Sequence, residues 1–324
     1  MVRTQWCMST DPNPACRKGF VRGLALAAVL AVSACSVDFG AAHQPSSQSD
    51  GIKPVGDSSA LPAPNMSAPD LPELFGLPKT VAFAADFADL RNALDGRVGI
   101  AIMPVGGGDM TELGDWTEGI AWSTITVPLA LAALRHDPDG MRATAEAAIT
   151  FSDNDAAQTL WNSLGNGSQA AEAVEAVLRE AGDTTTDVAA RHTKLAALES
   201  DDLLAFGATE WSLADQVHFA SRLPCLPRAN SVVSLMSEIT PSQSWGLGRL
   251  VGAEFKGGWG PDDITGKYTV RQFGLIPTLK GPIAVALAAE PNSGSFDDAT
   301  DMMDKLALLV GDHLPDLRGG LCSR

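Results

Sequence analysis

Three short motifs follow one another along the chain, and each contains a side chain that can take part in acyl-transfer chemistry. Ser123 stands at the start of the predicted helix 123–134. A hydroxyl there lies where backbone N–H groups and the helix dipole favour developing negative charge. Ser152 begins the triplet Ser-Asp-Asn. Lys256 lies on a predicted strand before two glycines, so its amine could attract a carboxylate while the glycine backbone lets a ligand approach closely. This order indicates a nucleophile, a proton relay and an anion-binding strand.

Each motif taken alone also has a purely structural explanation. Ser123 has the residue type of a helix cap, and Ser152 or Asp153 could cap the predicted helix 154–164. The Lys-Gly-Gly motif is explained equally well as the solvated end of a strand. It is the joint occurrence of the three, in this order, that makes the catalytic interpretation specific.

Together the motifs resemble the S-x-x-K, S-D-N and K-T-G signature of penicillin-recognising serine enzymes, and class A β-lactamases above all. The match is most extensive over residues 148–157, which read Ala-Ile-Thr-Phe-Ser-Asp-Asn-Asp-Ala-Ala. In that family the serine of the second motif passes a proton to the leaving nitrogen, and its asparagine binds substrate and the lysine. The resemblance implies a β-lactamase/transpeptidase-like fold. It assigns catalytic roles to Ser123, Ser152 and Lys256, and substrate binding to Asn154, Gly257 and Gly258.

The chain departs from the family signature where the chemistry depends on it most. The family's lysine, one helical turn after the nucleophile, is replaced by Thr126. An amine at that position accepts the serine proton, and threonine cannot do so at neutral pH. The E-x-x-L-N pattern of the deacylating glutamate is missing, and Glu199 is the nearest candidate. Lys256, acting through the serine of the second motif, and Lys194 are the candidate surrogates for the missing base.

The first 35 residues are predicted to be a lipoprotein signal peptide. Basic Arg17, Lys18 and Arg22 precede a short apolar run, and Val-Ser-Ala follows directly before Cys35. A basic segment, a short apolar segment and small residues before the cut are typical of a secretory signal. The segment resembles a lipobox, which implies acylation of Cys35 and attachment to the outer face of the cell membrane. The alternatives are an ordinary signal peptide that happens to contain a cysteine, and a core helix.

Two cysteines remain for the folded body once the leader and the lipidated residue are set aside. Cys7 and Cys16 precede the apolar run, and Cys35 would carry lipid. That leaves Cys225 and Cys322, which in an exported protein are a candidate disulfide. Two free buried thiols are the alternative.

Composition excludes some classes of function. The formal net charge is −16, which argues against binding to nucleic acid, since that needs basic patches. The five histidines are widely spaced, with no H-E-x-x-H or C-x-x-C pattern, so no metal site or other cofactor is expected.

The elements that must position the motifs indicate an α+β fold. Residues 36–75 are rich in Ser, Pro and Ala and are predicted to be a flexible linker, so the folded domain is expected over residues 76–324. Its predicted order is a helix, two strands, a block of helices, three strands and a closing helix. Joining the first two strands to the last three gives one five-stranded antiparallel sheet, with the terminal helices on one face and the helical block as a second layer. The predicted helices are 83–94, 123–134, 141–148, 154–164, 169–181, 212–221, 231–238 and 296–310, and the predicted strands are 97–104, 110–116, 254–256, 268–275 and 283–289.

These observations favour a membrane-anchored protein with a catalytically impaired β-lactamase-like domain. Such a domain would bind cell-wall peptide or another envelope protein where its relatives bind substrate. An active serine hydrolase using Ser123, as a weak β-lactamase, carboxypeptidase or esterase, is the alternative. A scaffold that uses none of the motif residues is the third possibility.

Overall fold

A computed structural model describes residues 79–188, 205–261 and 265–323. The predicted signal peptide, Cys35, the whole predicted linker 36–75 with the domain boundary after it, and the candidates Lys194 and Glu199 lie outside the described residues. Within the described part, no helix is long and apolar enough to cross a membrane. No cluster of potential metal ligands is found among those residues either.

The predicted five-stranded antiparallel sheet is confirmed. Its order is β2-β1-β7-β6-β5, so the two early strands join the three late ones through the pairing of β1 with β7. These two central strands are almost entirely buried, which is what a sheet covered on both faces requires. The strands are β1 (Gly96–Pro104), β2 (Thr111–Gly114), β5 (Glu254–Pro261), β6 (Tyr268–Ile276) and β7 (Ile283–Pro291).

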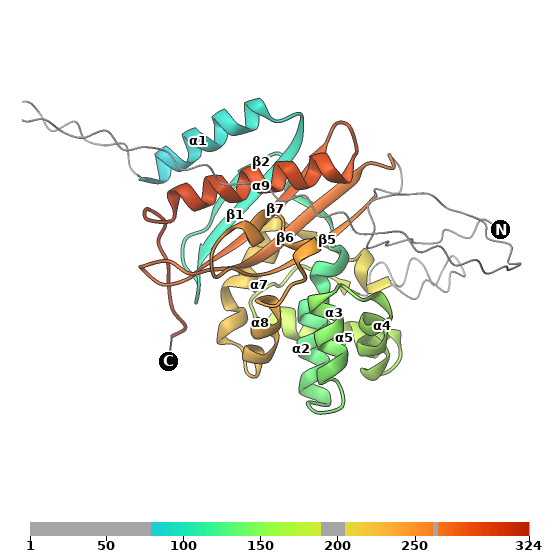
Figure 1. Ribbon diagram of the computed structural model, residues 1–324. Coiled ribbons are helices and arrows are strands. Elements are labelled where there is room, and N and C mark those ends of the chain that lie inside the picture. The colour runs from blue at the N-terminus through green and yellow to red at the C-terminus, as the bar shows by residue number, and fades with distance from the viewer. Residues whose placement is uncertain (1–78, 189–204, 262–264, 324) are drawn as a thin grey trace, which may run out of the picture. The chain divides into compact units, whose positions relative to one another are not determined.

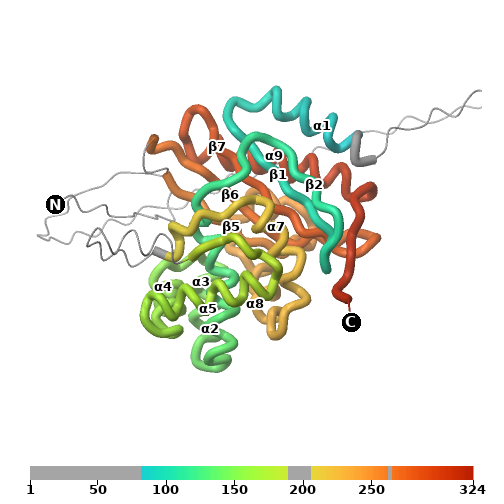
Figure 2. The backbone as a smooth tube through the Cα atoms, turned by 180° about the vertical axis from the view of Figure 1, so that it is seen from behind, coloured from blue at the N-terminus to red at the C-terminus, as the bar shows by residue number. Residues whose placement is uncertain are grey.

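Helices cover both faces of this sheet (Figures 1 and 2). Helix α9 packs on β6 and β7 with α1 beside it, and α7 packs on the opposite face against β1 and β7. The terminal helices therefore share one face, as predicted. The helices are α1 (Lys79–Ala93), α2 (Thr126–His136), α3 (Arg142–Thr150), α4 (Asn154–Ser163), α5 (Gly167–Glu180), α7 (Leu213–Arg222), α8 (Ala229–Met236) and α9 (Phe296–His313).

Helix α2 is the centre of the helical block. Every residue from Thr126 to Leu134 is buried, and α3, α4, α5 and α8 surround the helix (Figure 1). A helix that is apolar on all sides can be stable only inside such a layer. Because the turn that contains Ser123 leads directly into α2, the packing of the block fixes where that serine lies.

The structure differs from the predicted elements in two places that matter for the site. A second sheet pairs β3 (Glu118–Ile120) with β4 (Glu210–Ser212); strands of three residues are too short to show an alternating pattern. Ser123 lies in the 3₁₀ turn Trp122–Ile125, one turn before α2, rather than inside a continuous helix.

A disulfide joins Cys225 and Cys322, the pair selected in the sequence. Their Cα atoms are 5.4 Å apart, and the bond closes 97 residues of chain. It ties the C-terminal segment to the short 3₁₀ turn that follows α7.

Candidate active site

Strand β5 brings the third motif against the first. Successive residues of a strand point to opposite faces, so Lys256 and Gly258 share the face that meets the turn of Ser123. A Cβ added at Gly258 would lie 2.8 Å from the carbonyl oxygen of Ala121 and 2.9 Å from the backbone nitrogen of Ser123. Only glycine lets the two backbones approach this closely, so the glycine of the third motif is what seats the candidate nucleophile beside β5.

The turn that contains Ser123 has a strained backbone, which two side-chain hydrogen bonds stabilise. Trp122 has a left-handed φ of 51°, a conformation that costs a non-glycine residue about 1–3 kcal/mol and that persists only when its surroundings enforce it. The hydroxyl of Thr124 donates to the carbonyl of Ala121 across this residue. The side chain of Gln216 in turn donates to that hydroxyl at 3.0 Å.

The side chain of Gln216 is itself held by a fully buried arginine, Arg271. Arg271 donates to the side-chain oxygen of Gln216 at 2.9 Å and to the backbone carbonyls of Gly119 and Trp211, also at 2.9 Å. Its guanidinium lies over the ring of Trp116. Burial lowers the pKa of Arg271 to about 9. Arg271 therefore connects the main sheet, the small β3–β4 sheet and the turn of Ser123 in one polar network.

The second and third motifs meet through their side chains. Lys256 is fully buried, and its amine donates to the hydroxyl of Ser152 and, at 3.1 Å, to the carbonyl of Gly257. Burial lowers the pKa of Lys256 to about 7, because an ammonium loses its hydration there and no carboxylate among the described residues compensates for the loss. Near neutral pH this amine is therefore present in both its charged and its neutral form.

Ser152 lies two residues before the start of helix α4 and has a left-handed φ of 55°. The helix cap is Asp153, whose carboxylate accepts from the backbone N–H of Ala156 at 2.8 Å. The cap interpretation is thus correct for the aspartate, and it leaves the serine hydroxyl to contact other groups. That hydroxyl donates to the side-chain oxygen of Gln243 at 2.8 Å.

Solved structures share the fold of this chain, whereas family models and curated sequences give no match. No protein-family model matches the chain, and no curated protein does. The TLA-3 extended-spectrum β-lactamase matches with a TM-score of 0.59 and 14% identity over 73% of this chain and 99% of that one. An ancestral class A β-lactamase, GNCA, matches with a TM-score of 0.54 and 19% identity over 71% of this chain and 99% of that one. This chain has the β-lactamase fold. The expected β-lactamase/transpeptidase-like architecture is confirmed, and at these identities the comparison establishes the fold alone.

In this β-lactamase-like domain, a buried threonine stands at the position where the signature has a lysine. Thr126 is the first residue of α2 and only 2% exposed. Ser123 is 8% exposed, and within the described residues its hydroxyl has no hydrogen-bond partner. Asn154, the first residue of α4, is half-buried, and its amide likewise makes no hydrogen bond to another described residue.

The third motif has Gly257 where the signature has a threonine, and an indole ring lies beside this position. Gly257 points to the face of β5 opposite to Gly258, and a Cβ added there would lie 3.1 Å from the indole ring of Trp245. Trp245 is 7% exposed and packs edge-on against Trp259. A side chain at position 257 would therefore require the indole to shift by a few tenths of an ångström.

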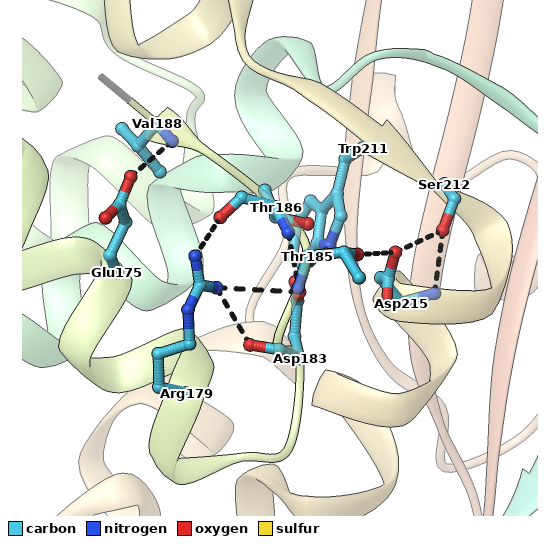
Figure 3. A network of polar contacts seen from close by, with 9 residues as sticks. All are labelled: Glu175, Arg179, Asp183, Thr185, Thr186, Val188, Trp211, Ser212 and Asp215. Atoms are coloured by element: carbon cyan, nitrogen blue, oxygen red, sulfur yellow. Dashed lines mark hydrogen bonds and ion pairs between the residues drawn. The ribbon is translucent and has the colours of Figure 1, made fainter. Parts of the chain in front are cut away.

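A polar network joins α5 to the residues that follow it and to strand β4 (Figure 3). Arg179 donates to the backbone carbonyls of Asp183 (at 2.8 Å) and Thr186. The buried carboxylate of Asp183 accepts from the indole of Trp211 at 2.9 Å. The backbone N–H of Val188 donates to the side chain of Glu175 at 2.7 Å, so these contacts hold residues 183–188 against α5. Glu199 and Lys194 lie beyond this segment, outside the described residues.

Sequence reasoning missed four residues that shape the site: Arg271, Trp245, Gln243 and Gln216. Gln243 follows a proline in the 3₁₀ turn Pro241–Gln243, and nothing in its surroundings matches a motif. Gln216 lies in α7. It is a polar residue on the apolar face of an amphipathic helix, and this is the one sequence signal that could have identified it.

Proposed function

We propose that this chain is a membrane-anchored lipoprotein with a catalytically impaired β-lactamase-like domain. Its ligand would be a cell-wall peptide with a free carboxylate, or an envelope protein that presents such an end, bound beside Ser123. The observation that carries the impairment is Thr126, buried one helical turn after Ser123. A threonine hydroxyl is not a base at neutral pH, so Ser123 lacks the group that would take up its proton.

The ligand class follows from the charge of the site. Lys256 and Arg271 are fully buried cations on neighbouring strands. Their hydrogen bonds among the described residues go to hydroxyl, carbonyl and amide oxygens, so neither charge is neutralised by a carboxylate there. An anionic group of a ligand near Gly258 would supply the missing negative charge.

A binding experiment tests this function directly. Calorimetric titration with a synthetic stem peptide should show binding without hydrolysis. A peptide with an amidated C-terminus should bind at least tenfold more weakly, and so should the Lys256→Met variant with the original peptide. Equal affinity for both peptides would reject the carboxylate-binding proposal.

The membrane anchor is proposed from residues outside the described structure. The lipobox-like Val-Ser-Ala-Cys ending at Cys35 supports acylation of that residue. Metabolic labelling with a clickable palmitate analogue should modify the full chain and not Cys35→Ala. The variant should also move from the detergent-rich to the aqueous phase in Triton X-114 partitioning. Labelling that persists in Cys35→Ala would contradict the proposal.

A weak serine hydrolase is the second candidate, and the contact between Lys256 and Ser152 favours it. A fully buried amine whose pKa lies at about 7 is partly neutral at physiological pH and could serve as a distant base. Under this alternative a fluorophosphonate probe labels the wild type and not Ser123→Ala. Absence of labelling across several probes would eliminate it.

A further inference from the structure

Gln243 is the contact residue of Ser152 that no motif predicts. It is 5% exposed. Its side-chain NH₂ group donates to the carbonyl of Phe151 at 2.9 Å, and its side-chain oxygen accepts from Ser152 at 2.8 Å. Because a backbone carbonyl can only accept, Phe151 determines which end of the amide faces Ser152. That end is the oxygen.

The hydroxyl of Ser152 therefore donates to one of its two neighbours and accepts from the other. A hydroxyl has a single proton, and here it is donated to Gln243. Toward Lys256 the hydroxyl can only accept, and the amine is the donor. The chain of donors thus runs from Lys256 through Ser152 and Gln243 to the carbonyl of Phe151. It ends on a backbone group that cannot pass a proton further.

We propose that Gln243 is a positioning residue that holds Ser152 in an accepting orientation, so that the relay serine has no proton to give to a group bound beside Ser123. The site would then be impaired twice, once at Thr126 and once at this hydroxyl. The inference rests on the proposed function for its consequence only, since the orientation itself can be measured in the unliganded domain.

The ionisation of Lys256 reports this orientation. In the wild type the hydroxyl oxygen accepts from the amine and favours the ammonium form. In Gln243→Leu the hydroxyl is free to rotate and donate to the neutral amine. The pKa of Lys256, followed through its ¹³Cε resonance and assigned with Lys256→Met, should fall by about half to one unit, the size expected for one net hydrogen bond.

A double-mutant cycle separates the hydroxyl from other effects of the amide. Gln243→Leu should leave the pKa of Lys256 unchanged when it is made in a Ser152→Ala background. Ser244→Ala removes a neighbouring hydroxyl that donates to Thr240, and it should have no effect in either background. An equal shift with and without the Ser152 hydroxyl would overturn the proposal.

A second measurement decides the matter if Gln243→Leu does not fold. Neutron diffraction from deuterium-exchanged wild-type crystals should place the deuteron of Ser152 on the line to Gln243. A deuteron directed at Lys256 or toward Ser123 would overturn the proposal. Acylation of wild-type Ser123 by a penicillin would instead contradict the proposed function, without altering either of these results.

Discussion

Lys256 donates a hydrogen bond to the hydroxyl of Ser152, which lies 104 residues earlier in the chain. This contact joins the second and third motifs, and the close approach of Gly258 to the backbone of Ser123 joins the third to the first. The three motifs thus meet through one backbone contact and one side-chain pair. Three residues after Ser123, where the signature that they resemble has a lysine, this chain has a buried threonine.

The buried amine should make stability depend on pH. Burial lowers the pKa of Lys256 from 10.5 to about 7 in the folded domain, so between these values the unfolded chain binds more protons than the folded one. The free energy of unfolding therefore rises with pH across this window. Below pH 7 the amine is charged in the folded domain, and its burial lowers the free energy of unfolding by the full amount. Lys256→Met should stabilise the domain most at pH 6 and progressively less toward pH 10, as measured by urea unfolding.

The control for this measurement is Lys305→Met, which replaces an exposed lysine of α9. Its effect on the free energy of unfolding should not change between pH 6 and pH 10. A stability difference between wild type and Lys256→Met that is the same at every pH would contradict the account.

Gly258 should be intolerant of any side chain. An added Cβ would meet backbone atoms of Ala121 and Ser123 at 2.8 and 2.9 Å, and these cannot move without displacing the turn. Gly258→Ala should lower the free energy of unfolding by about 1–3 kcal/mol, the usual cost of overpacking. Gly207→Ala is the matched control, because its Cβ would have no neighbour closer than 3.9 Å among the described residues. Chemical denaturation of the two variants should separate them clearly, and equal stability would show that β5 and the turn are not in close contact.

Restoring the hydroxyl of the third motif should be costly because of Trp245. In Gly257→Thr the new side chain would meet the indole at 3.1 Å or less, so we expect a loss of about 1–3 kcal/mol in the free energy of unfolding. The same change in a Trp245→Leu background should cost much less. A cycle of the four proteins, followed by urea unfolding, measures this coupling, and purely additive effects would remove Trp245 as the reason for glycine at position 257.

The layers of the fold could be predicted from sequence because their signals are local and repeated. The switch from helical to alternating periodicity after residue 254 predicted three late strands, and β5, β6 and β7 lie there. The start of α4 at Asn154 was also anticipated, since an Asx-type cap marks it. The short strands β3 and β4 were missed because three residues carry no period.

The site was harder to predict than the fold, because its decisive contacts connect distant segments. Ser152, Lys256 and Gly258 could be selected by motif alone. The orientation of the Ser152 hydroxyl depends on Gln243, 91 residues away, and the filled space beside Gly257 depends on Trp245. Neither residue belongs to a motif, and only the packing of the η4 turn Pro241–Gln243 and the residues after it against the site gives them a role.

A lysine placed at position 126 should restore part of the lost chemistry. Thr126→Lys would put an amine one turn after Ser123, on the same side of the helix. We expect slow acylation of Ser123 by a fluorescent penicillin over hours, and none in Thr126→Lys combined with Ser123→Ala. The variant should also be less stable than the wild type, because position 126 is buried. Absence of any adduct in a folded Thr126→Lys protein would show that the missing amine is not what limits the reaction.

The most direct test of catalytic impairment is the intact mass of the wild-type domain after prolonged incubation with a penicillin. The wild-type mass should not change, while Thr126→Lys should gain one acyl group in the same experiment. A wild-type protein that carries an acyl group on Ser123, located by peptide mass spectrometry, would contradict catalytic impairment.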